Sequence, residues 1–457
     1  MSQPSAGSDP IAVITAQTAA EIAEAVRDLV DTGQLAPGAS LPPVRTFAEQ
    51  LAVNRNTVVA AYGLLVQAGV AVTRGRAGTR IVDLQPLPQE GFTHAPGLVD
   101  IASGNPDPTL LPDASKALAQ LTADEPVLYG QPVIDPDLAC WARDIYATDV
   151  GEAALTVTAG SADAVQRLLA DSLTIGDAVG FEQPCFLTTL QTAQAAGYRP
   201  VAMPVDDEGL TVEGLEAALE EGIRALVVTP RAHNPTGAVI SAARARSLAA
   251  LLSKYPHVLI IEDDHFWQLS GHRYRSIIPS GHPRWALVRS VSKSLGPDLR
   301  VGLVGSDRLT ASRLAAHIRS GTMWVSHLLQ RLAYLLASHD ETPAQLAYAA
   351  AEYARANASL IEALEQEQIA STAADGVNVW INLETVAAPV VDALMNFGWL
   401  VRDGAEFSLD ATDAAMNHIR VTIHQLSTEQ LNQFVTDLAE VLQRRRPALS
   451  ESKNTVD

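Results

Sequence analysis

Short apolar runs alternate with helix-like stretches over most of the chain beyond Asp100, and this alternation limits the possible fold more than any other feature. Five runs are expected to be buried strands: Leu155–Thr158, Ala178–Phe181, Ala225–Thr229, Val258–Ile261 and Ala286–Val288. Strands that are separated by helices form a mainly parallel sheet with helices packed on it. We therefore predict an α/β fold, in which ligand-binding residues gather at the carboxyl ends of the strands.

One of only four lysines in the chain follows the last of these strands. Lys293 lies in the stretch RSVSKSLGPDLRVG, with Ser290 and Ser292 before it and Arg300 after it. A lysine in a partly desolvated pocket loses its proton readily and can form a Schiff base, and the fork of an arginine suits a phosphate. Pyridoxal phosphate has both a carbonyl and a phosphate and would use all of these groups. A surface lysine near a turn is the simpler alternative, but it would leave the surrounding pattern unexplained.

Polar motifs also follow the other predicted strands. Ser161 and Ala162 open a helix, where backbone N–H groups make an anion site. Phe186 can stack on a flat ring, although alone it would more readily be a core residue, and Asn234 can donate to a phenolic oxygen. Asp263 can keep a pyridine nitrogen protonated, which makes the ring an electron sink. Together these residue types favour pyridoxal phosphate.

Adjacent acids at a strand end can instead bind a metal ion. Asp263 and Asp264 are followed by His265, but we find no further His or Cys set nearby. The sequence therefore predicts no metal site.

The first 82 residues show the pattern of a winged helix-turn-helix. Residues 15–33, 41–52 and 55–65 have helical spacing, with Asn54 as the expected cap of the third helix, and residues 70–82 are expected to form a hairpin wing. The third helix would present Arg55, Asn56 and Thr57 where recognition helices meet base edges. The basic residues expected to face double-stranded DNA are Arg45, Arg55, Arg74, Arg76 and Arg80. A small helical cap with solvated arginines is the alternative, and it explains less of the pattern.

The charge is unevenly distributed along the chain. The net charge is −20, which argues against bulk affinity for nucleic acid or for an anionic membrane. Residues 1–83, however, hold six arginines against seven acids, so this segment is close to neutral. No apolar run reaches the length of a membrane span. The two cysteines and the polar N-terminus, which lacks the order of a signal peptide, predict a cytoplasmic protein with no membrane partner.

These motifs together resemble a known family. The stretch GQLAPGASLP, followed by RTFAEQLAVNRNTV and GRAGT, resembles the winged helix of GntR-type bacterial regulators. Residues 100–440 resemble a fold-type I aminotransferase, and the fusion resembles the MocR family of transcription regulators. The motifs PPVR, NRNTV and GNPDP look most like the PtsJ-type branch of that family, which is linked to vitamin B6 metabolism.

The resemblance implies a role for each residue singled out above. Lys293 would be the catalytic residue that forms the Schiff base with pyridoxal phosphate. The other residues implied to touch the cofactor are Ser161, Ala162, Phe186, Asn234, Asp263, His265, Ser290, Ser292 and Arg300. Tyr129 would reach the phosphate of a neighbouring subunit, which implies a homodimer, and Arg420 would bind the carboxylate of an effector. An exposed strand arginine in a salt bridge is the alternative for Arg420.

Three positions depart from the family pattern. His265 stands where the family has a tyrosine, and a histidine changes its charge near neutral pH. Phe186 replaces a second tyrosine, and Ile134 replaces a glycine. These changes weaken transamination more than cofactor binding. We therefore expect a sensor of pyridoxal phosphate, or of an amine condensed with it, that controls transcription. An active aminotransferase with an appended winged helix is the alternative.

The expected domain order has four parts. They are a winged helix-turn-helix at 11–82, a proline-containing linker at 83–99, an aminotransferase-like domain at 100–445 with a smaller C-terminal α+β subdomain, and a disordered tail at 446–457.

Overall fold

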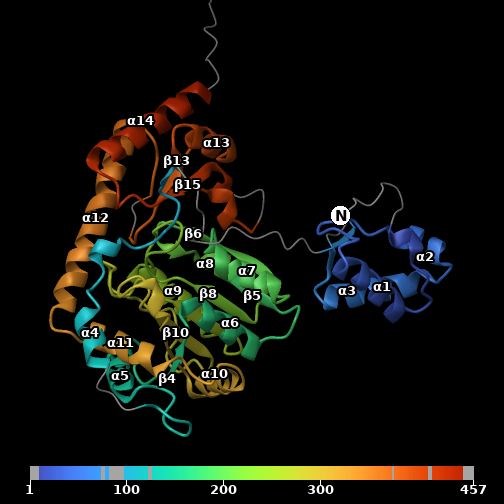
Figure 1. Ribbon diagram of the computed structural model, residues 1–457, viewed down its shortest axis with the longest axis horizontal. Helices are drawn as coiled ribbons and strands as arrows, with labels where there is room; N and C mark the ends of the chain where they lie inside the picture. The colour runs from blue at the N-terminus through green and yellow to red at the C-terminus, as the bar shows by residue number, and fades with distance from the viewer. Residues whose placement is uncertain are drawn as a thin grey trace, which may run out of the picture. The chain divides into compact units, whose positions relative to one another are not determined.

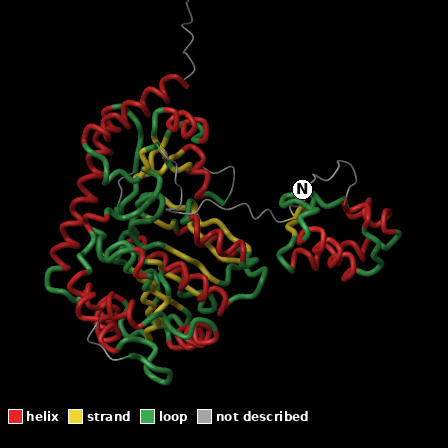
Figure 2. Tube along the Cα trace, viewed as in Figure 1, coloured by secondary structure: helices red, strands yellow, loops and turns green. Residues whose placement is uncertain are grey.

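The computed structural model describes residues 10–73, 78–81, 97–121, 126–372, 375–409 and 414–445. The chain divides into two compact units, with the boundary in sequence between Leu87 and Pro88. Each unit has its own hydrophobic core, and Figures 1 and 2 show the helices and strands of each. The expected tail and most of the expected linker lie outside the described residues.

The N-terminal unit is a helix-turn-helix followed by a short hairpin. Its elements are α1 (Ala19–Asp31), α2 (Val44–Leu51), α3 (Arg55–Gln67), β1 (Ala71–Thr73) and β2 (Thr79–Ile81). The Thr18 side chain and Glu21 form a capping box at the start of α1. The Asn54 side chain accepts a hydrogen bond from the Asn56 N–H at 2.9 Å, so the predicted cap of α3 is confirmed.

The core of this unit comes from the predicted apolar faces. Its buried residues include Ile22, Val26, Val58, Ala61 and Leu65. Phe47 of α2 stacks on Tyr62 of α3 with ring centroids 6.1 Å apart. The Tyr62 hydroxyl donates to the Pro42 carbonyl at 2.6 Å, which ties the turn before α2 to α3.

The C-terminal unit is built on an eight-stranded sheet with the order β4-β11-β10-β9-β8-β5-β6-β7. The strands are β4 (Ala154–Thr158), β5 (Ala178–Gln183), β6 (Arg199–Asp206), β7 (Gly209–Leu210), β8 (Ala225–Val228), β9 (Leu259–Asp263), β10 (Trp285–Ser290) and β11 (Gly302–Ser306). Strands β10, β9, β8, β5 and β6 are parallel, whereas β11 lies antiparallel between β10 and β4. The predicted mainly parallel sheet is confirmed, but β6 and β11 were absent from the expected strands.

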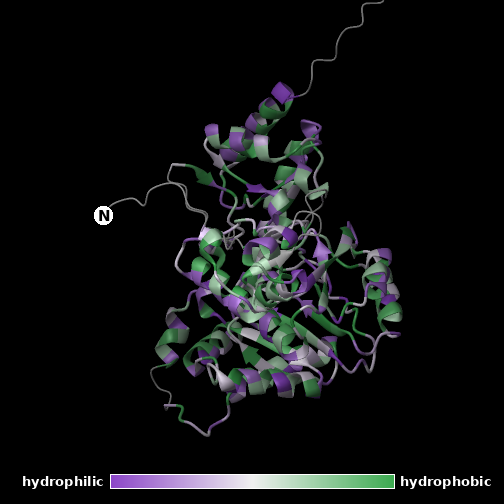
Figure 3. Ribbon diagram, turned by 90° about the vertical axis from the view of Figure 1, so that its right-hand side faces the viewer, coloured by the Kyte–Doolittle hydropathy of each residue, from purple (hydrophilic) through white to green (hydrophobic). Residues whose placement is uncertain are grey.

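Helices cover both faces of this sheet. They are α4 (Ser115–Leu121), α5 (Pro136–Asp149), α6 (Ser161–Ser172), α7 (Leu187–Ala195), α8 (Val212–Glu220), α9 (Ala242–Leu252), α10 (Arg308–Ser320) and α11 (His327–Ala337). Ile260 of β9 belongs to the core with α5, α8, α9 and α11, and its neighbour Ile261 belongs to the core with α6, α7 and α10. In Figure 3 the strands are mainly coloured hydrophobic, as expected for a sheet that is buried on both faces.

A smaller subdomain follows, linked to the large one by the long helix α12 (Thr342–Gln366). It contains the antiparallel sheet β12-β15-β14 and the parallel pair β13-β3. Its elements are β3 (Val99–Asp100), β12 (Val379–Asn382), α13 (Ala388–Asn396), β13 (Trp399–Leu400), β14 (Arg402–Asp403), β15 (His418–Val421) and α14 (Thr428–Arg445). Val99 pairs with Trp399, so the last residue of the expected linker is already part of this subdomain.

Candidate cofactor and DNA-binding sites

A cavity of about 650 Å³ opens where β5, β8, β9 and β10 end. Every residue predicted to touch the cofactor lines it, except Tyr129. These residues are Ser161, Ala162, Phe186, Asn234, Asp263, His265, Ser290, Ser292, Lys293 and Arg300. Other residues that line the cavity were not expected from the sequence; they include Asn105, Pro106, Glu182, Cys185, Thr189 and Asp298. The chemical pattern of the missed set is weak, because it mixes carboxylates with small and apolar side chains.

One end of the cavity is suited to an anion. Gly160 caps α6 with φ of 100° and no side-chain hydrogen bond, so the N–H groups of the first turn remain available to a ligand. Arg300 lies against this turn, and its Nη2 donates to the Ala159 carbonyl at 2.7 Å. A Cβ on Gly160 would lie 2.7 Å from that same Nη2, so only glycine fits here. The Ser290 and Ser292 hydroxyls lie 3.0 Å apart in the same cavity.

Asp263 supplies a buried carboxylate to the cavity. Its Oδ1 has no hydrogen-bond partner among the residues that the structure describes. Burial, together with the charges of Asp264 and Glu182, raises the pKa of Asp263 to about 7, against the smaller effect of a hydrogen bond from Ser161. A cationic N–H donor is the partner that this carboxylate lacks. The ring nitrogen of pyridoxal phosphate fits that requirement.

Lys293 and His265 both line the cavity, and the charge of Lys293 affects the pKa of His265. The Lys293 amine donates to the Gly104 carbonyl at 2.5 Å. Burial, and then the positive charge of Lys293, lower the pKa of His265 to about 4. The expectation that His265 changes its charge near neutral pH is therefore wrong, because burial disfavours the imidazolium. A neutral imidazole can still donate or accept a hydrogen bond here.

Arg420 does not itself line the cavity, but it forms a hydrogen bond with Asn234, which does. Its Nη1 donates to the Asn234 side-chain oxygen at 3.0 Å, and its Nη2 donates to the Ala102 carbonyl at 2.5 Å. The guanidinium carbon stands 5.0 Å from the centre of the Phe407 ring. Arg420 is fully buried on β15, so the alternative of an exposed strand arginine is wrong.

Tyr129 lies away from the cavity of its own chain. Its side chain is 80% exposed, and its ring meets Trp324 edge-on at 5.4 Å. The implied contact of Tyr129 with a neighbouring subunit stays a prediction.

The recognition helix presents polar side chains at its N-terminus. Arg55 and Asn56 are exposed, and Thr57 is half-buried. Arg45 is exposed on α2 and forms an ion pair with Glu49 at 3.0 Å. Arg80 is exposed on β2, whereas Arg74 and Arg76 lie outside the described residues.

Two other kinds of site are not found in the described part of the chain. No group of three or more His, Cys, Asp or Glu side chains there could hold a metal ion. None of its helices is both long and apolar enough to cross a membrane.

Comparison with known proteins assigns both units. The gntR family of bacterial regulatory proteins matches residues 18–81, and the aminotransferase class I and II family matches residues 96–438. The kynurenine aminotransferase of Pyrococcus horikoshii shares the fold, with a TM-score of 0.71 and 21% identity, over 77% of this chain and 92% of that chain. These matches define a DNA-binding regulator whose second unit has the class I aminotransferase fold, a fold that typically binds pyridoxal phosphate.

Two of the similar proteins are transcriptional regulators. The chain is 42% identical to the vitamin B6 salvage pathway transcriptional repressor PtsJ of Salmonella typhimurium. The match extends over 440 residues and covers 94% of this chain and 100% of the relative. The chain is 29% identical over 258 residues to the pyridoxine biosynthesis transcriptional regulator PdxR of Corynebacterium glutamicum, which covers 53% of this chain and 55% of the relative. The chain belongs to the MocR family of transcription regulators.

Proposed function

We propose that this regulator binds pyridoxal phosphate in the cavity of its C-terminal unit and changes its affinity for operator DNA in response. The effector is either pyridoxal phosphate itself or an amine that reacts with it. The observation that carries the proposal is the cavity, which gathers Lys293, Asp263 and Arg300 in a chain whose other unit exposes a recognition helix. When bound, pyridoxal phosphate supplies a carbonyl that reacts with amines and a ring that withdraws electrons.

The residues at the anion end would hold the phosphate. The N–H groups at the start of α6 and the Arg300 fork provide charge and direction. Ser290 and Ser292, which also line the cavity, would add hydroxyl donors.

The remaining residues would orient the ring. Asp263 would hold the proton on the ring nitrogen, and Phe186 would lie against the ring face. Asn234 and the neutral His265 would donate to the phenolic oxygen. Lys293 would hold the cofactor covalently through its amine.

The position of Arg420 supports an effector that carries a carboxylate. Arg420 is buried and already oriented by its hydrogen bonds to Asn234 and Ala102. The guanidinium does not itself line the cavity, so a carboxylate effector would have to displace Asn234 from Arg420 in order to pair with it. Because Asn234 also lines the cavity, a ligand there would be sensed by both residues.

A homodimer is part of the proposal. Large apolar side chains are exposed around Tyr129; they are Val127, Leu128, Val133, Met323 and Leu328. These residues belong to two segments, 127–133 and 323–328. A hydrogen bond of 2.9 Å between the His327 ring and the Pro132 carbonyl fixes one segment against the other. An exposed apolar group of this kind supports a subunit interface, and a dimer suits paired half-sites on DNA.

The regulated genes are proposed from the relatives. The names of PtsJ and PdxR refer to vitamin B6 salvage and to pyridoxine biosynthesis. We propose that this chain likewise controls genes of vitamin B6 metabolism, since a regulator that binds pyridoxal phosphate would report the supply of that cofactor.

An active aminotransferase is the second candidate. The observation that favours it is the complete set of Lys293, Asp263, Asn234 and the buried Arg420 in one unit. Repeated turnover of amino acids with a keto-acid acceptor would establish this activity. The exposed arginines of the N-terminal unit have no use in such a reaction, and so the regulator remains the favoured function.

The decisive experiment compares the wild type with Lys293→Ala and Lys254→Ala. Lys254 is an exposed lysine outside the cavity and serves as the matched control. The wild type and Lys254→Ala should show visible absorbance from bound cofactor, and adding pyridoxal phosphate should change their affinity for DNA fragments that flank the gene. Lys293→Ala should lose the absorbance. Retention of the absorbance by Lys293→Ala would refute the assignment of the lysine.

A further inference from the structure

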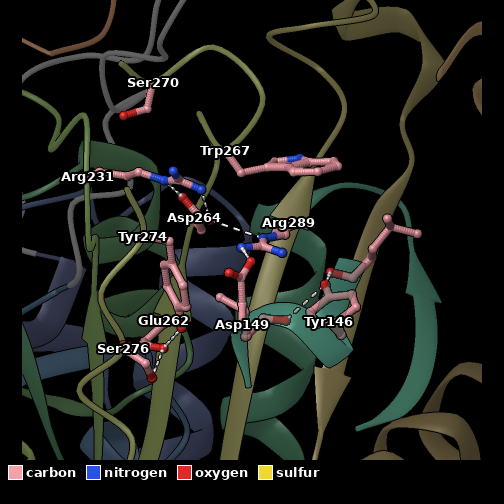
Figure 4. A network of polar contacts seen from close by, with 12 residues as sticks. Tyr146, Asp149, Arg231, Glu262, Asp264, Trp267, Ser270, Tyr274, Ser276 and Arg289 are labelled. Atoms are coloured by element: carbon pink, nitrogen blue, oxygen red, sulfur yellow. Dashed lines mark hydrogen bonds and ion pairs between the residues drawn. The ribbon is translucent and has the colours of Figure 1, made fainter. Parts of the chain in front are cut away.

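A network of buried charged side chains surrounds the end of β9 (Figure 4). Its centre is Asp264, which is fully buried just beyond β9. Successive residues of an extended strand point to opposite faces. Asp263 lines the cavity together with Val227 and Ser290, whereas Asp264 points towards the side of the sheet that α5 covers.

Asp264 joins three neighbouring strand ends. Its carboxylate accepts two hydrogen bonds from Arg231, from Nε at 2.7 Å and from Nη2 at 2.8 Å. It also accepts one from Arg289 Nε at 3.1 Å. Arg231 follows β8, Asp264 follows β9 and Arg289 belongs to β10. A single carboxylate therefore fixes the spacing of β8, β9 and β10 where they reach the cavity.

Arg289 extends the network to helix α5 and to aromatic rings. Its Nη2 donates to Asp149 at 2.6 Å. Its guanidinium carbon lies 5.2 Å from the centres of the Trp267 and Tyr274 rings and 5.4 Å from that of Tyr146. Such contacts hold a buried guanidinium in one orientation.

The aromatic residues also bond the backbone of the strands. The Trp267 indole N–H donates to the Ser290 carbonyl at 3.0 Å. The Tyr146 hydroxyl donates to the Leu287 and Leu303 carbonyls, at 3.2 and 2.9 Å. The network thus reaches the backbone of Ser290, which lines the cavity.

Arg231, Asp264 and Arg289 are each a close neighbour in sequence of a residue that lines the cavity. Arg231 precedes Asn234 by three residues, Asp264 directly follows Asp263, and Arg289 directly precedes Ser290. We infer that Asp264 is a positioning residue: with Arg231 and Arg289 it holds Asn234, Asp263 and Ser290 at the mutual spacing that the cofactor requires. The inference rests on the proposed binding of pyridoxal phosphate.

Glu262 offers a matched control on the same strand. It is as fully buried as Asp264 and lies two residues away, on the same face of β9. Its carboxylate accepts hydrogen bonds from the Tyr274 hydroxyl, from the Ser276 hydroxyl at 3.0 Å and from the Ile277 N–H at 2.7 Å. All of these donors belong to one loop. Among the described residues, the Glu262 carboxylate makes no hydrogen bond to β8 or β10, and it reaches Arg289 only through the Tyr274 ring.

The experiment compares Asp264→Asn and Glu262→Gln in the full chain. Hydrogen exchange without added cofactor reports the backbone at residues 229–234 and 289–293, and visible absorbance gives the dissociation constant for pyridoxal phosphate. Asp264→Asn should speed exchange in both segments and weaken cofactor binding by about tenfold or more, because small misplacements of a site are costly. Glu262→Gln should change both quantities much less, because Glu262 reaches Arg289 only through the Tyr274 ring.

Equal effects of the two substitutions would overturn the inference, because both residues would then act only in folding. Trp267→Phe is a milder variant, should Asp264→Asn fail to fold. It keeps an aromatic ring against Arg289 and removes the N–H that bonds the Ser290 carbonyl, so faster exchange should appear at 289–293 alone. A wild type that takes up no pyridoxal phosphate would refute the proposed function, and the exchange data would still decide whether Asp264 fixes the strand ends.

Discussion

Replacing Asp263 by asparagine is expected to stabilise the cofactor-free protein and to weaken cofactor binding. Burial, with the charges of Asp264 and Glu182, raises the pKa of Asp263 from 3.8 to about 7 in the folded protein. The unfolded chain releases this proton at about pH 4. Between about pH 4 and about pH 7 the folded state keeps a proton that the unfolded state has lost. The stability of the wild type therefore falls as the pH rises through this range and stays lower above it.

The size of the effect follows from the shift. A difference of about three pKa units corresponds to about 4 kcal/mol near pH 8, at about 1.4 kcal/mol per unit. A buried asparagine amide costs about 1–2 kcal/mol of its own. The cofactor-free Asp263→Asn variant should thus exceed the wild type in unfolding free energy by about 2–3 kcal/mol near pH 8, and the gain should vanish near pH 5. Loss of a hydrogen bond to a charged group should weaken cofactor binding by about 10- to 150-fold.

Urea denaturation of the cofactor-free proteins, followed by tryptophan fluorescence, measures the stability difference. All six tryptophans belong to the C-terminal unit, so the signal reports that unit. Asp144→Asn, an exposed change on α5, is the control. An Asp263→Asn protein that is less stable than the wild type near both pH 5 and pH 8 would refute the reasoning.

Three further predictions concern both units. Arg55→Ala should weaken DNA binding and lower the salt slope of the affinity by about one. Arg45→Ala should change binding less, because a carboxylate one helical turn away already pairs with Arg45; filter binding across a salt series compares the two, and equal losses would contradict this ranking. Thr18→Ala removes the capping box of α1 and should destabilise the N-terminal unit by about 1 kcal/mol, which circular dichroism during melting would detect; an unchanged melting curve would argue against the cap. Gly160→Ala places a Cβ against Arg300 and should weaken cofactor binding by about tenfold, measured by absorbance, while normal binding would show that the turn can adjust.

The features that the sequence predicted are those with a local pattern. Asn54 precedes a helix with the right side chain for a cap, and the structure shows that hydrogen bond. Asp263 and Lys293 each follow an apolar run, and parallel strands bring such ends together in one cavity. Local chemistry at strand ends was therefore sufficient to predict which residues gather.

Other features depend on contacts that no local pattern marks. Strand β11 contains Gly302 and Gly305, where a Cβ would meet Gly160 and the Tyr146 ring at close range, so it lacks the continuous apolar run of a buried strand. Arg231 and Arg289 are 33 and 25 residues from Asp264 in sequence. Charged residues are ordinarily expected on the surface unless they are paired, and partners so far apart in sequence cannot be recognised from a local pattern. Their burial follows from mutual pairing, which only the fold reveals.

The end of β9 also limits how this chain can change in evolution. Asp263 and Asp264 are chemically alike, but one faces a ligand cavity and the other faces two arginines. Inserting or deleting one residue in Leu259–Asp263 would exchange the two faces. A deletion would place Asp264 at the cavity and His265 against the two arginines, and an insertion would place Glu262 at the cavity and Asp263 against the arginines. The length of this strand is therefore fixed by the need to keep two identical side chains in two different environments.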